Sequence, residues 1–146
     1  MAEAMAFLVM PPIIAGLIIG IYEYTLLRHD VSAFPIHRFS HAIAALIYAV
    51  VACFCTFNAE WVLATFTFLQ SIPYITPLTF QILVALITVL KVHGVSYAIP
   101  GSRVGMGMGM RGMSETWIHS LVIGALTVIA PYVWPLLAPA LPDWMQ

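Results

Sequence analysis

The chain has 146 residues, of which 62% are hydrophobic and only 8% are charged, and its net charge at pH 7 is −1. A soluble domain usually carries about 25% charged residues, which it needs to cover its surface with polar groups. The composition therefore excludes an ordinary soluble domain and predicts an all-α integral membrane protein, because lipid accepts so apolar a surface. Since there is no basic excess, nucleic acid is also excluded as a partner.

Four apolar stretches have lengths close to the roughly 20 residues that cross the hydrocarbon core of a bilayer. We predict a single domain, residues 1–146, whose four transmembrane helices form a bundle. Pro11 and Pro12 suit the first turn of the first helix, and Ser114 is the expected N-cap of the fourth. No Lys or Arg precedes the first apolar stretch, so we expect it to be retained rather than cleaved as a signal peptide. The predicted spans cover about 11–28, 38–57, 78–98 and 115–134.

The stretch between the second and third spans, residues 58–77, is compatible with three structures. It can extend the second helix, lie in the membrane interface as a half-helix anchored by Trp61, or form a re-entrant hairpin broken at Pro73 and Pro77. Glu60 and Trp61 are typical of a membrane–water boundary, which favours an interfacial half-helix at about 59–71 over the re-entrant one. The C-terminal stretch from 131 to 142 contains four prolines, so we expect a regular helix to fray there.

The positive charges predict the orientation of the chain in the membrane. Arg28 and Arg38 lie between the first two spans, Arg103 and Arg111 lie between the last two, and the opposite side has no Lys or Arg. The positive-inside rule then places both basic loops in the cytoplasm and both termini outside, in the inner or plasma membrane. We expect these four arginines to contact anionic lipid headgroups.

One loop, residues 101–113 with the sequence GSRVGMGMGMRGM, alternates Gly and Met. Closely spaced thioethers suit Cu(I), but the loop contains no Cys or His to complete such a site. A phosphate cradle is excluded, because no strand precedes the glycines and no Gly-Lys-Ser/Thr follows them. We expect a pliable cytoplasmic loop that is partly buried at the interface; a gating or partner-binding loop is the alternative.

Six ionisable residues are expected to form a polar layer near the cytoplasmic ends of the spans. Counting about 1.5 Å per residue from the span ends puts five of them, all except Glu115, roughly 5–10 Å deep. Ionisable groups inside a span normally face other helices and pair with polar groups there. The layer is therefore expected to orient the helices, with Glu23 paired to Lys91. The alternative is that it forms a proton or ion path. Lys91 and His93 are two residues apart and cannot both face the centre. The layer comprises Glu23, His41, Lys91, His93, Glu115 and His119.

Two pairs at four-residue spacing, His37 with His41 and Glu115 with His119, can each present two ligands on one helix face. If the pairs faced each other, the set would bind a metal, and two histidines across a wider gap would bind haem. We predict no cofactor, no catalytic residues and no enzymatic activity. Cys53 and Cys55 are not spaced as Cys-x-x-Cys and are expected to be buried thiols.

Small residues recur at four-residue spacing in three of the spans, where they let helix backbones approach closely in lipid. Such stripes serve packing within the chain, with copies of it, or with other subunits. We therefore predict a small membrane protein that acts by assembly, as a homo-oligomer or as a small subunit of a larger membrane complex. The alternative is a small channel or carrier, or a metal- or haem-binding protein, that uses the polar layer. The expected packing residues are Gly16, Gly20, Ala45, Ala49, Ser120 and Gly124.

Overall fold

The computed structural model describes residues 7–30, 35–97 and 117–145, with only the backbone described for 26–30, 35–42 and 95–97. All regular structure in these ranges is helical, and they contain no strand. Two short helices, α3 and α4, lie between the second and third long helices, and two 3-10 turns at 138–140 and 143–145 follow the last. The helices are α1 (Met10–Asp30), α2 (Pro35–Phe57), α3 (Ala59–Thr65), α4 (Thr67–Gln70), α5 (Pro77–Tyr97) and α6 (Trp117–Leu137).

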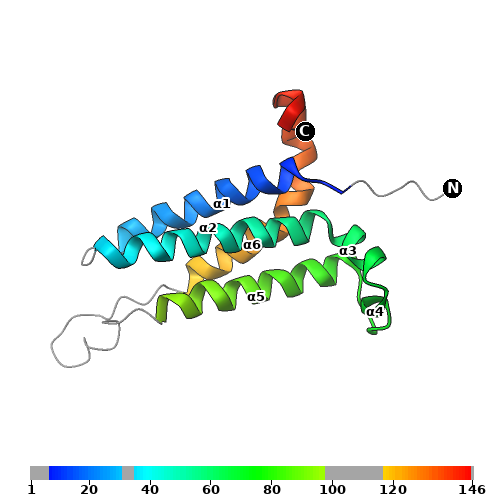
Figure 1. The fold of residues 1–146 in the computed structure, drawn as a ribbon, viewed down its shortest axis with the longest axis horizontal. Coiled ribbons are helices and arrows are strands. Elements are labelled where there is room, and N and C mark those ends of the chain that lie inside the picture. The colour runs from blue at the N-terminus through cyan, green and yellow to red at the C-terminus, as the bar shows by residue number, and fades with distance from the viewer. Residues whose placement is uncertain (1–6, 31–34, 98–116, 146) are drawn as a thin grey trace.

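The long helices run in alternating directions, and α2 contacts each of the other three. Figure 1 shows α1, α2 and α5 running alongside one another, while α6 crosses them obliquely and carries the C-terminus away from the rest. α1 also contacts α6, and α5 contacts α6. Each long helix, over the residues that the structure describes, begins and ends within a few residues of a predicted apolar stretch.

The start of α5 has a clear local cause. The amide of Thr76 donates to Thr79 Oγ1 at 2.7 Å, and the amide of Thr79 donates back to Thr76 Oγ1 at 3.2 Å. This reciprocal arrangement is a capping box, and it satisfies two backbone donors that a helix start leaves open. Pro77 follows at the first helical position, where its missing N–H costs nothing.

The proline-rich end of α6 is more regular than the sequence predicts. The helix continues through Pro131 and Pro135 to Leu137, so the expectation that it frays from Pro131 is wrong for these residues. A proline removes one backbone donor, but in apolar surroundings no water competes for the remaining backbone groups. Two side chains also attach this segment to other helices, since Tyr132 donates to Gln81 and Trp134 packs edge-on against Phe57. Only beyond Leu137 does the chain tighten into the two 3-10 turns.

Glycines allow α1 to lie directly against α2. A Cβ atom added at Gly16 would lie 2.5 Å from Val50 Cα, and one added at Gly20 would lie 2.6 Å from Leu46 Cδ1. The first of these distances is to backbone, which cannot swing aside. The Gly-x-x-x-Gly pattern of the first span therefore serves packing within the chain.

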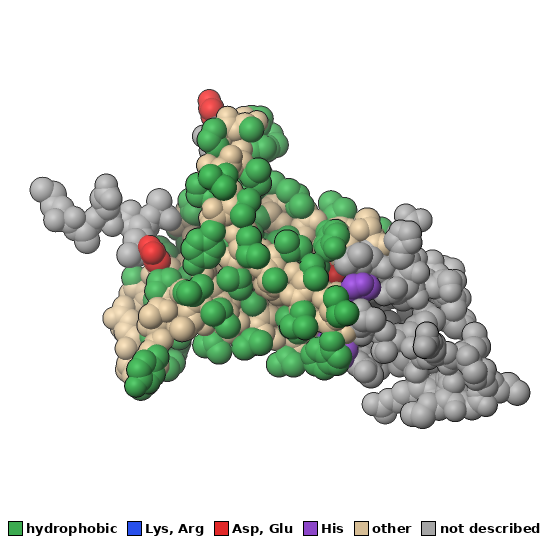
Figure 2. All heavy atoms as spheres, turned by 180° about the vertical axis from the view of Figure 1, so that it is seen from behind, with side chains coloured by type: hydrophobic (Ala, Val, Ile, Leu, Met, Phe, Trp, Pro, Cys, Tyr) green, Lys and Arg blue, Asp and Glu red, His purple; other side chains and the backbone are tan. Residues whose placement is uncertain are grey.

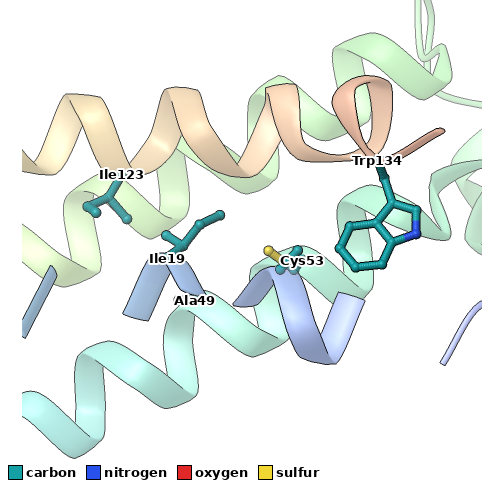
Figure 3. Close-up of a cluster of buried hydrophobic side chains, with 6 residues drawn as sticks. Ile19, Ala49, Cys53, Ile123 and Trp134 are labelled. Atoms are coloured by element: carbon teal, nitrogen blue, oxygen red, sulfur yellow. The ribbon is translucent and has the colours of Figure 1, made fainter. Parts of the chain in front are cut away.

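The other predicted packing residues also lie between helices of the same chain. A Cβ atom at Gly124 of α6 would lie 2.5 Å from Val89 Cγ2 of α5. Ala45, Ala49 and Ser120 are all buried. Figure 3 shows side chains of α1 and α6 converging on α2 in one apolar cluster, which is formed by Ala15, Ile19, Ala49, Cys53, Ile123 and Trp134.

Two described helices, α5 and α6, are long and apolar enough to cross a membrane. A third candidate span is obtained if Ile43–Phe57 of α2 and the helix α3 are counted together as one bent span. The described apolar part of α1, Met10–Thr25, is shorter than a full span. Hydrophobic side chains cover most of the described face in Figure 2. The outward faces of the long helices therefore carry the apolar surface that a bilayer covers.

Candidate functional site

Glu23 of the predicted polar layer is buried, with 1% of its surface exposed. Glu23 lies one helical turn after Ile19 and therefore on the same face of α1. Ile19 belongs to the apolar cluster that also contains Ile123 of α6. α1 and α6 run in opposite directions (Figure 1), so the last turns of α1, which include Glu23, and the first turn of α6, where His119 is half-buried, lie toward the same end. The structure thus brings Glu23 and His119 to the same end of the long helices.

His93 of α5 lies at that end too, and it is 6% exposed. Its ring stacks on the indole of Trp117, with ring centroids 3.7 Å apart and an angle of 23° between the planes. Trp117 is the first residue of α6, so this stack joins the end of α5 to the start of α6. Figure 2 shows histidine side chains at this edge of the molecule.

Lys91 lies near the same end of α5 but is exposed. It lies on the exposed side of α5, two residues from the buried His93, as the helical period requires when one of the two faces inward. Among the described residues, no ion pair links Lys91 to Glu23. A long lysine side chain near a helix end can carry its ammonium group to the membrane surface without a partner.

Other predicted site residues lie wholly or partly outside the described part of the chain. Arg28 belongs to the backbone of α1, and His37, Arg38 and His41 belong to that of α2, but their side chains are not described. Among the described side chains, no group of three or more His, Cys, Asp or Glu is placed to hold a metal ion. The residues that lie wholly outside the described ranges are Arg103, Arg111, Ser114 and Glu115, together with the Gly-Met loop.

A second group of polar side chains, not predicted as a site, lies where α2 ends. After Phe57 the chain bends by 71° into α3, so the alternative in which residues 58–77 extend the second helix is wrong. The bend residue Asn58 is buried, and its Oδ1 accepts a hydrogen bond from the amide of Leu8 at 2.7 Å. Its Nδ2 donates to the carbonyls of Leu8 and Phe54, each at 3.0 Å. Asn58 thus hydrogen-bonds to both the amide and the carbonyl of Leu8.

Gln81 connects three helices at the same level. Its Nε2 donates to the carbonyl of Thr56 in α2 at 2.8 Å, and its Oε1 accepts from the hydroxyl of Tyr132 in α6 at 2.6 Å. Both Gln81 and Thr56 are buried. Where a helix bends, carbonyls lose their usual partners, and polar side chains of neighbouring helices replace them. We call Thr56, Asn58, Gln81 and Tyr132 the bend network.

The bend network is suited to holding backbone rather than to chemistry. Its amide and hydroxyl groups carry no charge and are engaged by backbone carbonyls, by the Leu8 amide or by each other. The signal that predicts such a contact is a lone amide inside an apolar run, as in PLTFQILVALI around Gln81, because a polar side chain in a span hydrogen-bonds to a neighbouring helix. No protein-family model, no curated protein and no solved structure matches this sequence.

Proposed function

We propose that the chain is an integral membrane protein with four spans that acts by assembly, as a homo-oligomer or as a small subunit of a larger membrane complex. The supporting observation is that the small and polar residues of the interior contact other helices of the same chain, whereas the outward faces are apolar. The glycines on α1 and α6 and the bend network hold the chain's own helices together, while the outward faces of α5 and α6 are apolar. Such a molecule offers its partners a helical surface within the bilayer rather than a large soluble domain.

The stoichiometry of the protein in lipid tests this proposal. We expect molecules tagged with one fluorophore each and extracted directly into nanodiscs to bleach in a fixed number of steps above one, or to co-purify with a second membrane subunit. Diluting the protein with excess lipid before extraction is the control, because chance co-capture falls with dilution whereas a specific assembly persists. A single bleaching step under every condition, without a co-purified subunit, would contradict the proposal.

The orientation that accompanies this proposal places both termini outside and the loop at 101–113 in the cytoplasm, with the arginines near anionic headgroups. In a chain with Cys53 and Cys55 replaced by alanine, a Gly107→Cys variant is expected to react with an impermeant maleimide only from the cytoplasmic side. Asp143→Cys, near the C-terminus, is the matched control and should react only from outside. Labelling of Gly107→Cys from outside would overturn the orientation.

No cofactor is proposed, and a channel or carrier is less well supported by the described residues. A path across the membrane needs polar side chains that continue from the layer around Glu23 toward the opposite end. The buried hydroxyls of Thr56, Thr88 and Thr127 lie along that direction, but each donates to a carbonyl of its own helix. The described residues therefore favour a role for the polar layer in packing the ends of the long helices against one another.

A further inference from the structure

The segment between α2 and α5, residues 59–76, forms an elbow whose exposed side chains, apart from Glu60, are apolar or uncharged. Phe68 is 66% exposed and Tyr74 is 92% exposed, and Phe66 and Ile72 are also exposed. Glu60 is the only Asp, Glu, Lys or Arg in the elbow. Exposed aromatic and aliphatic side chains without charges are typical of segments that lie between lipid headgroups and acyl chains.

The backbone of the elbow is largely bonded within itself. The amides of Phe66, Leu69 and Ile72 donate to carbonyls three or four residues earlier in the chain, at 2.8–3.0 Å. The side chain of Gln70 folds back and donates to the carbonyl of Leu63 at 2.8 Å. A segment whose polar backbone groups are paired internally can enter an apolar medium, whereas an open loop would leave these groups without partners.

The inner side of the elbow is already covered by the protein. Ala59 and Leu63 of α3 are buried, α3 contacts α5, and the ring of Trp61 lies 4.8 Å from that of Phe7. The 71° bend turns α3 away from the axis of α2, so if α2 crosses the bilayer, α3 lies close to the plane of the membrane. The exposed side is also continuous with the candidate span α5, whose first turns expose Leu78 and Ile82.

We propose that the outer side of the elbow is an interaction surface for lipid, with Phe66, Phe68 and Ile72 inserted at the boundary between headgroups and acyl chains. The lipid partner is identified by the continuity of this surface with α5 and by its lack of charge. The inference does not depend on assembly, since a monomer and an oligomer can both present the elbow to the bilayer.

Spin-label accessibility in proteoliposomes tests this surface. In a chain with Cys53 and Cys55 replaced by alanine, labels are placed by Phe68→Cys and Ile72→Cys, with Leu86→Cys on the outward face of α5 as the lipid reference and Glu60→Cys as the matched elbow control. The labels at 68 and 72 are expected to collide more with oxygen, which concentrates in lipid, than with a water-soluble nickel chelate. The label at 60 is expected to show the reverse.

Two results would overturn the proposal. Chelate accessibility at 68 and 72 equal to that at 60 would place the elbow in water. Low accessibility to both reagents would show that protein covers it, and a second copy of the chain would then be distinguished by spin–spin broadening that disappears on dilution with unlabelled protein. If removal of the cysteines prevents folding, a photo-crosslinking amino acid at 68 in the otherwise native chain replaces the labels, with lipid adducts expected and protein adducts contradicting the proposal.

Discussion

Gly16→Ala is expected to destabilise the folded protein by about 1–3 kcal/mol, the cost of overpacking a close contact. The added methyl group would lie 2.5 Å from Val50 Cα, which belongs to the backbone of α2 and cannot rotate away. α1 and α2 must therefore separate locally, and they lose dispersion contacts along the helix pair. Reversible unfolding in bicelles, followed by steric trapping or by detergent titration, measures the change in free energy.

Gly94→Ala is the matched control for this substitution. A Cβ atom at Gly94 meets no heavy atom within 4 Å, and Gly94 lies within the last turns of α5. Alanine forms helix more readily than glycine, so this variant is expected to gain up to about 1 kcal/mol. Equal stability of the two alanine variants would show that α1 and α2 do not pack through Gly16.

Gln81→Leu is expected to produce the second large loss of stability. Leucine has nearly the volume of glutamine, but it leaves the buried carbonyl of Thr56 without its donor and the hydroxyl of Tyr132 without its acceptor. An unpaired buried polar group costs about 1–3 kcal/mol, and the carbonyl belongs to Thr56, a fully buried residue next to the bend. The same unfolding measurement reports this loss.

Two controls separate the bend network from a general effect of removing an amide. Gln70→Leu removes a hydrogen bond of similar length, to the carbonyl of Leu63, but Gln70 is exposed in the elbow, at the proposed headgroup boundary where water can replace the lost donor, so we expect a much smaller change. Tyr132→Phe removes one bond of the network while Gln81 keeps its bond to Thr56, and its effect should lie between the two. If Gln70→Leu costs as much as Gln81→Leu, the burial of the network does not contribute to stability.

Much of the helical framework follows from apolar length and from local start signals. The α5 helix begins at Pro77 because Thr76 and Thr79 cap each other, and both the proline and the threonines are visible in the sequence. The continuation of α6 through Pro131 and Pro135 was not predictable from local rules, because they assume that water competes for the backbone. At the 71° bend, Asn58 hydrogen-bonds to Leu8, a partner 50 residues away that no local pattern reveals.

The candidate site was predictable in part and for a similar reason. Helical periodicity shows that either Lys91 or His93 faces the other helices, but the choice depends on how α5 is rotated against α6. In the structure Val89 packs against Gly124 and His93 stacks on Trp117, so this face of α5, with His93, is turned toward α6. Glu23 was noticed because it is an ionisable residue inside a span, whereas Gln81 was missed because ionisable residues were considered and uncharged amides were not.

The hydrogen bonds between Asn58 and Leu8 have a consequence for how the chain enters the membrane during synthesis. Their partners are 50 residues apart, so the segment that leads into α1 is made well before the side chain that holds it. Gly16 and Gly20 can pack against Val50 and Leu46 as soon as α2 is made, but Leu8 gains its side-chain partner only when residue 58 has been added. A ribosome-bound chain ending before Asn58 would therefore contain the packed pair of α1 and α2, while the segment that leads into α1 would still lack the side chain that holds Leu8.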